Sequence, residues 1–131
     1  MYREEYARVS GGVLLSRQAE LRELPAPAVF GSKMRTALLM LVAVLEETYP
    51  AELARYLGSS ISSVQRTLDK IEEERLVATR QGVVRSVTLN PLYPAVNELR
   101  SLLLRLAEGY PDYQRIKESR RLRPRRRGKP S

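Results

Sequence analysis

Hydrophobic residues recur at helical spacing in two short segments near the middle of the chain. In the first segment, residues 50–57, Leu53 and Leu57 fall on one face, and the small Ala54 allows a neighbouring helix to approach closely. Gly58 follows at once, and a residue without a Cβ readily adopts the left-handed conformation that ends many helices. The pattern therefore predicts a helix over residues 50–57 that ends at Gly58.

A second amphipathic helix is expected to begin near Ser60, whose hydroxyl can cap free backbone N–H groups. Its apolar residues lie at steps of three and four and predict one buried stripe: Ile61, Val64, Leu68 and Ile71. Its polar residues fall on the opposite face: Ser62, Ser63, Gln65, Arg66, Asp69 and Lys70. Two helices joined by so tight a turn are typical of a helix-turn-helix, whose second helix presents its N-terminal residues to base edges in the major groove of DNA. An ordinary helical hairpin with a solvated face is the alternative.

After Leu76 the hydrophobic period changes from helical to alternating, which indicates a β-hairpin. The segments VATR and VVRSVTLN flank Gln81-Gly82, and Pro91 ends the second of them. Gly82 supplies the positive φ that a two-residue turn requires, and β-branched residues lie on both sides of it. A hairpin directly after such a helix is the wing of a winged helix-turn-helix.

The predicted wing carries polar and basic residues near its turn. Arg80, Gln81 and Arg85 occupy positions from which a wing reaches phosphates or the minor groove. The sequence leaves the strand register open. Pairing Arg80 with Val83 would place both arginines on the apolar face of the second strand, where one of them could bury its stem and extend only its charged end.

The stretch from about Ser32 to Leu106 resembles the winged-helix bacterial and archaeal regulators of the ArsR and MarR type. The order of elements is the same, and the resemblance rests on LARYLGSSISSVQRTLDKIEEERLV, on the short wing ATRQGVVRSVTLNP and on the leucine-rich helix YPAVNELRSLLLRLAE. It covers a little over half the chain. Arg75 departs from the pattern, because such regulators usually have a glycine before the wing.

The resemblance implies a homodimer that represses or activates transcription at a palindromic operator, in some members under control of a metal or a small molecule. The soft or borderline ions that metal-responsive members sense need thiolate or imidazole ligands, and this chain has no cysteine and no histidine. The acids of residues 72–74 spread around a helix and offer no cage for a hard cation. We therefore expect no metal and no cofactor.

The seven tyrosines are scattered along the sequence and do not define a pocket for an effector, so a small-molecule effector stays an open question.

Catalysis is not expected of this sequence. There is no histidine to serve as a general base, no cysteine nucleophile and no glycine-rich loop to hold phosphates. The serines of residues 59–63 have no partner suited to activating them, and helix capping or DNA contact explains them more simply.

Length and composition fit one domain with appendages, because 131 residues with an apolar fraction of 43% can form a modest core. The absence of cysteine is consistent with a reducing cytoplasm, where we expect the protein. Residues 1–10 are charged and polar, so we expect no signal peptide there. The longest apolar run, residues 37–45, is far too short to cross a bilayer, which needs about 20 residues. It predicts instead a central buried helix over residues 32–47, capped by Ser32.

The segments that flank this region are rich in leucine. The helix expected over residues 93–108 has a stripe widened by two further leucines: Val96, Leu99, Leu103 and Leu106, with Leu102 and Leu104 beside them. Residues 13–24 add more leucines before the break at Pro25-Ala26-Pro27. Burial against a second chain is the economical use of so wide a face, and packing within one chain is the alternative. We therefore expect an N-terminal extension with a dimerisation helix (1–31), a winged domain (32–91) and a C-terminal dimerisation helix with its end (92–113).

The net charge of +8 is unevenly distributed. Residues 1–113 hold 14 basic and 14 acidic residues, whereas residues 114–131 hold nine basic residues against Glu118 alone. Proline, glycine and dense like charge predict a basic disordered tail over residues 114–131. Such a tail binds any DNA sequence by releasing counterions, or serves only solubility.

These features predict a mainly α protein with a small β-hairpin wing, a winged helix-turn-helix domain with flanking N- and C-terminal helices. The expected function is that of a sequence-specific regulator of transcription that binds double-stranded DNA as a homodimer. The residues expected at the DNA are Ser60, Ser62, Ser63, Gln65, Arg66, Lys70, Arg80, Gln81 and Arg85. Two alternatives remain: a nonspecific nucleic-acid binder driven by the tail, and a protein-interaction module, which the neutral charge of residues 1–113 favours.

Overall fold

A computed structural model describes residues 24–122 of the chain. Its elements, in chain order, are α3 (Lys33–Leu45), α4 (Pro50–Leu57), α5 (Ile61–Glu73), β1 (Val77–Arg80), β2 (Ser86–Leu89), α6 (Val96–Ala107) and α7 (Pro111–Leu122). The two strands pair antiparallel, so the predicted fold class, mainly α with one β-hairpin, is confirmed. No helix within residues 24–122 is both long and apolar enough to cross a membrane.

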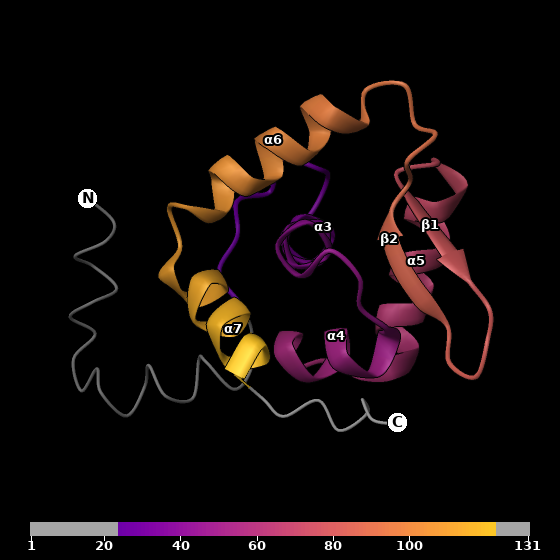
Figure 1. Ribbon diagram of the computed structural model, residues 1–131, viewed down its shortest axis with the longest axis horizontal. Coiled ribbons are helices and arrows are strands. Elements are labelled where there is room, and N and C mark those ends of the chain that lie inside the picture. Colours follow the sequence, from indigo (N-terminus) through magenta and orange to yellow (C-terminus); the bar gives the residue numbers. More distant parts are fainter. Residues whose placement is uncertain (1–23, 123–131) are drawn as a thin grey trace.

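Helix α3 forms the centre of the molecule. Every residue from Thr36 to Leu45 is buried, because α4, α6, α7 and the hairpin surround the helix (Figure 1). An apolar sequence on all sides of a helix requires such cover. The helix begins at the predicted cap, where the Ser32 hydroxyl accepts a hydrogen bond from the backbone N–H of Arg35 at 3.0 Å. It ends at Leu45, slightly before the predicted boundary, because Glu46 has a positive φ of 72°.

Helices α4 and α5 form the predicted helix-turn-helix. Gly58 has φ 67° and ψ 35°, the left-handed conformation expected at the end of α4. Ser60 caps α5 by accepting a hydrogen bond from the N–H of Ser63 at 3.1 Å. Leu53 and Leu57 of α4 are buried, as expected of the face that α4 turns to the core.

The buried stripe of α5 is shorter than the period predicts. Val64, Leu68 and Ile71 are fully buried, but the side chain of Ile61 is 46% exposed. Ile61 opens the helix, and this first turn extends beyond the core. The prediction that Ile61 belongs to the buried stripe is therefore wrong.

Helix α5 ends in a sharp turn of the chain at Arg75, the position where similar regulators usually have a glycine. Arg75 has φ 66°, and its N–H donates to the carbonyl of Glu72 at 2.9 Å, while the N–H of Leu76 donates to the carbonyl of Ile71 at 3.0 Å. These two bonds define a Schellman motif, in which glycine usually takes the left-handed position. Arginine adopts this conformation here, and the chain turns into β1.

Replacing Arg75 with glycine is expected to stabilise the protein by about 0.5 to 1 kcal/mol. Glycine relieves the steric cost of the left-handed conformation, which outweighs its larger entropy in the unfolded chain. Urea denaturation measures the change. Arg75→Ala is the control, because it removes the same exposed side chain but keeps the Cβ, and it should give no gain. Equal stability of the glycine and alanine variants would contradict the argument.

The two strands of the hairpin are joined by a longer loop than the two-residue turn that the sequence favoured. Arg80 lies opposite Ser86, not Val83, and Val77 lies opposite Leu89. Residues 81–85 therefore form a five-residue loop in place of a tight turn at Gln81-Gly82. The observed register pairs the buried Val77 with the buried Leu89 on one face.

Strand β2 is also held from its other edge, by the segment that links α3 to α4. Thr48 exchanges two backbone hydrogen bonds with Val87, at 3.0 and 2.8 Å. This bridge joins the wing to the region just before the helix-turn-helix. It fixes β2 through a contact between residues far apart in the sequence.

Helix α6 crosses over α3 and buries part of its leucine face within the chain (Figure 1). Leu99, Leu103 and Ala107 are buried, whereas Leu102 and Leu104 are 44% and 37% exposed. Packing within one chain thus accounts for the centre of the stripe. The exposed leucines remain available, and dimerisation through them stays a prediction.

The prediction of disorder from residue 114 onward is wrong for residues 114–122, which are helical in α7. The helix is anchored by Tyr113, whose fully buried side chain donates a hydrogen bond from its hydroxyl to the carbonyl of Pro25 at 2.9 Å. Burial raises the pKa of the Tyr113 phenol, so it remains a neutral donor. The rest of the predicted tail, residues 123–131, and the predicted N-terminal helix up to residue 23 lie outside the described residues.

Candidate nucleic-acid interface

The outer face of α5 is the centre of the candidate site. Ser62, Gln65, Arg66 and Lys70 are exposed, because the opposite face of the same helix is fully occupied by the core. Ser63 is half-buried at the edge. The structure thus brings the predicted residues of α5 onto one continuous polar surface that starts at the N-terminus of the helix.

Short polar contacts order the first turns of this face. The Ser60 hydroxyl, already engaged as the cap, lies 3.4 Å from the Ser62 hydroxyl. Arg66 donates from Nη2 to the Ser63 hydroxyl at 3.4 Å. Ser60 thus has a structural role in α5. The guanidinium of Arg66 extends along the helix toward its N-terminal end.

The wing runs back along α5, because the chain reverses direction at Arg75. Thr79 on β1 donates to Oε2 of Glu72 at 2.9 Å. Arg85, the last residue of the wing loop, reaches Asp69, one turn nearer the N-terminus of α5. The loop of residues 81–85 therefore lies beside α5, at the same end of the molecule as α4 (Figure 1). Arg80 and Gln81, two of the wing residues that the sequence suggested, are exposed there.

Arg85 has partners within the chain. Its Nη2 lies 3.2 Å from a carboxylate oxygen of Asp69 and 3.2 Å from one of Glu72, and its side chain is only 17% exposed. Its Nε is buried and has no hydrogen-bond partner. The sequence suggested that Arg85 contacts the DNA backbone. The structure instead places its guanidinium between the wing and the acidic side of α5.

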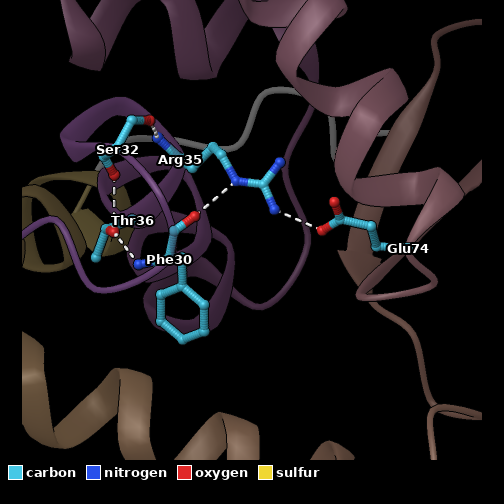
Figure 2. A network of polar contacts seen from close by, with 5 residues as sticks. All are labelled: Phe30, Ser32, Arg35, Thr36 and Glu74. Carbon is cyan, nitrogen blue, oxygen red and sulfur yellow. Dashed lines mark hydrogen bonds and ion pairs between the residues drawn. The ribbon is translucent and has the colours of Figure 1, made fainter.

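A second arginine fixes the C-terminal end of α5 to the start of α3. Arg35 pairs with Glu74 at 2.5 Å and donates from Nε to the carbonyl of Phe30 at 2.7 Å (Figure 2). Thr36 completes the network by accepting from the N–H of Phe30 and donating to the carbonyl of Ser32. The end of α5 is thereby held by groups from the central helix.

These pairs determine the charge that α5 presents. Asp69 and Glu72 are partnered by Arg85, and Glu74 is partnered by Arg35. Three of the four acids in residues 69–74 thus have an arginine partner within the chain, and the fourth, Glu73, is exposed. The exposed cations of the helix are Arg66 and Lys70, so the outer face can meet an anionic partner without strong repulsion.

Arg55 is a further candidate for this surface that the sequence did not suggest. Arg55 is exposed on α4, and its guanidinium carbon lies 5.1 Å from the centre of the Tyr56 ring. Such stacking orients an arginine while leaving its N–H groups available. The first helix of a helix-turn-helix crosses the DNA backbone, and an exposed arginine in its last turn was the signal that could have identified the residue.

Among residues 24–122, no three acidic side chains come together in an arrangement that could hold a metal ion. The chemistry available at this surface is hydrogen bonding from amide, hydroxyl and guanidinium groups, together with positive charge.

No protein-family model matches the chain, and no curated protein matches it. Solved structures of Lactococcus lactis ZitR, described as a zinc-responsive MarR family member, are similar to it. One shares 16% identity with a TM-score of 0.52 and covers 91% of this chain and 85% of ZitR. The wild-type structure shares 18% identity with a TM-score of 0.51 and covers 90% and 83%. At this identity the likeness concerns the fold, and together with the helix-turn-helix and its hairpin it establishes that the chain has the winged-helix fold.

Proposed function

We propose that this protein binds double-stranded DNA through α5 and the wing and thereby regulates transcription. The observation that carries the proposal is the outer face of α5, where Ser62, Gln65, Arg66 and Lys70 are exposed on a helix whose other face is buried. Such a helix can enter the major groove without losing any core contact. The winged-helix fold shared with ZitR supports this proposal.

The side chains divide by chemistry. Gln65 can donate to N7 and accept from the N6 amino group of adenine, and Arg66 can donate to both N7 and O6 of guanine. Both side chains are exposed near the N-terminus of α5. Ser62 and Ser63 serve nearby bases or phosphates. Side chains at the margin of this surface contact the phosphate backbone, and such contacts position the protein without specifying sequence. They are the cations Arg55, Lys70 and Arg80, together with the neutral Gln81 on the wing.

The proposal includes a homodimer. Leu102 and Leu104 remain exposed on α6. Helix α6 itself is set apart from α5 in Figure 1. Covering them with a second chain would leave both recognition helices free, and a two-fold dimer would place these helices about 34 Å apart, one DNA turn. An inverted-repeat operator follows from this symmetry.

The zinc response described for ZitR is not part of the proposal. Zinc prefers thiolate and imidazole ligands, and this chain contains neither cysteine nor histidine. Any signal that controls the proposed binding would therefore act through other chemistry.

Selection of bound sequences from a random duplex pool, using the full chain, tests the proposal. We expect an enriched inverted repeat whose affinity falls moderately with salt. Binding without enrichment, with a steep loss at high salt, would indicate a nonspecific binder driven by the basic C-terminal residues. Failure to retain any duplex at low salt would contradict DNA binding and favour a protein partner.

Replacing Arg66 with alanine is expected to weaken binding to the enriched site by about 1 to 3 kcal/mol if Arg66 pairs with guanine. The same change would then relax the preference at one base position, whereas a phosphate contact would weaken all sequences alike. Arg115→Ala is the matched control, because Arg115 is exposed on α7, outside the proposed DNA and dimer surfaces, and pairs with Asp112 of the same helix. Equal affinities of wild type and Arg66→Ala for the site at low salt would remove the assignment.

A further inference from the structure

Ile61 is an apolar side chain at the start of a polar surface. It is 46% exposed, whereas the other apolar residues of α5 are fully buried. Its neighbours along the chain, Ser60 and Ser62, are both exposed. A half-exposed isoleucine at this position leaves apolar area in water that contact with a partner would cover.

The position of Ile61 on the helix specifies what it faces. Four residues advance an α-helix by slightly more than one turn, so Ile61 lies about 40° from Gln65 around the axis and one turn nearer the N-terminus. Gln65 is exposed and belongs to the proposed base-contacting set. Ile61 therefore lies on the margin of the surface that would enter the major groove, next to Gln65.

Thymine offers the matching chemistry. Its C5-methyl is the apolar group that bases present in the major groove, and apolar side chains contact it. Cytosine, the other pyrimidine, presents an amino donor instead. We propose that Ile61 is a specificity-determining residue that contacts the C5-methyl of a thymine, adjacent to the base that Gln65 contacts. This inference rests on the proposed DNA binding.

The wing loop carries further exposed apolar residues. Val83 is fully exposed, and Val84 is 58% exposed. Arg85, directly after them, is tied to Asp69 and Glu72 of α5, so the loop stays close to this helix. The valines offer a matched comparison, because they are exposed and apolar but belong to the wing and not to the recognition helix.

Uracil substitution tests the contact directly, since deoxyuridine differs from thymidine only by the missing methyl. Synthetic duplexes of the enriched site, each with one thymine replaced, are titrated with the full chain. We expect one thymine in each half-site to be sensitive, with a loss of about fourfold per methyl, the value of one buried CH₂ group. The other thymines should tolerate the replacement.

The same duplexes are then titrated with Ile61→Ala. We expect the penalty for uracil at the sensitive position to vanish in this variant, because the partner of the methyl is gone. Val84→Ala is the control and should keep the full penalty. Thermal unfolding of Ile61→Ala should stay within a few degrees of the wild type, since Ile61 does not belong to the buried core.

The outcomes separate the inference from the proposed function. An enriched site at which no thymine is sensitive, or a uracil penalty that persists in Ile61→Ala, would overturn the role of Ile61 and leave DNA binding intact. Absence of binding to any duplex would overturn both.

Discussion

Replacing Arg120 with alanine is expected to lower the free energy of unfolding by about 2 to 4 kcal/mol. Glu52 on α4 is 2% exposed, and Arg120 on α7 provides its charge partner, with Nε 3.3 Å from Oε2. Thr48 donates to the other carboxylate oxygen at 2.7 Å. Arg120 also donates to the carbonyls of Leu45 and Glu47, at 3.0 and 2.7 Å. Its loss would leave a buried carboxylate with a single neutral donor, and removing one partner of a buried pair is strongly destabilising.

Urea denaturation of the full chain measures this loss. Adding Glu52→Gln to Arg120→Ala should recover part of the stability, because a buried amide costs less than an unpaired charge. Arg121→Ala is the matched control: Arg121 neighbours Arg120, is 63% exposed and lies 3.9 Å from Glu118, so its removal should cost less than about 0.5 kcal/mol. An Arg120→Ala protein as stable as Arg121→Ala would show that Glu52 does not depend on this pair.

Replacing Arg85 with glutamine is expected to weaken binding to the enriched duplex about 100-fold. Asp69 and Glu72 would lose their charge partner, and two free carboxylates would then lie on the helix that approaches the phosphates. The wing would also lose one of its ties to α5. Fluorescence titration of a labelled duplex at fixed salt measures the effect.

A double-mutant cycle decides whether Arg85 acts through these acids or by touching DNA itself. The change Arg85→Gln is repeated in a protein that carries Asp69→Asn and Glu72→Gln. If Arg85 serves to compensate the acids, the loss should shrink to a few-fold in the neutralised protein. If its guanidinium contacts phosphates, as the sequence suggested, the loss should be the same in both backgrounds.

Local signals along the chain predicted the parts of the fold that depend on local physics. Gly58 ends α4 and Ser60 begins α5, because a left-handed residue and a capping hydroxyl act within one turn of their own positions. The spacing of Val64, Leu68 and Ile71 likewise determines which side of α5 is buried. The candidate site on α5 follows from the same period.

Features that depend on distant partners were not predictable in this way. The wing register is fixed with help from Thr48, which lies far from Val87 in the sequence. The ion pairs of Arg85 are formed with acids 13 and 16 positions away. The spacing of apolar residues also does not show where along a helix the core ends. Ile61 fits the apolar spacing of α5 but lies outside the core.

Helix α7 illustrates the limit of composition as a signal. Dense basic charge favours disorder on average, yet individual residues of this segment have specific partners. Tyr113 bonds to Pro25, 88 positions away, and Arg120 bonds to Leu45, 75 positions away. Such contacts order a charged helix because the surrounding fold supplies the carbonyls and the carboxylate.

The short link between α3 and α4 has a mechanical consequence. Thr48 is bonded through its backbone to β2 and through its hydroxyl to Glu52, which is paired with Arg120. The wing, the first helix of the helix-turn-helix and the C-terminal helix thus converge on a single threonine. We therefore expect a displacement of α7 to act on β2 and α4 together through Thr48.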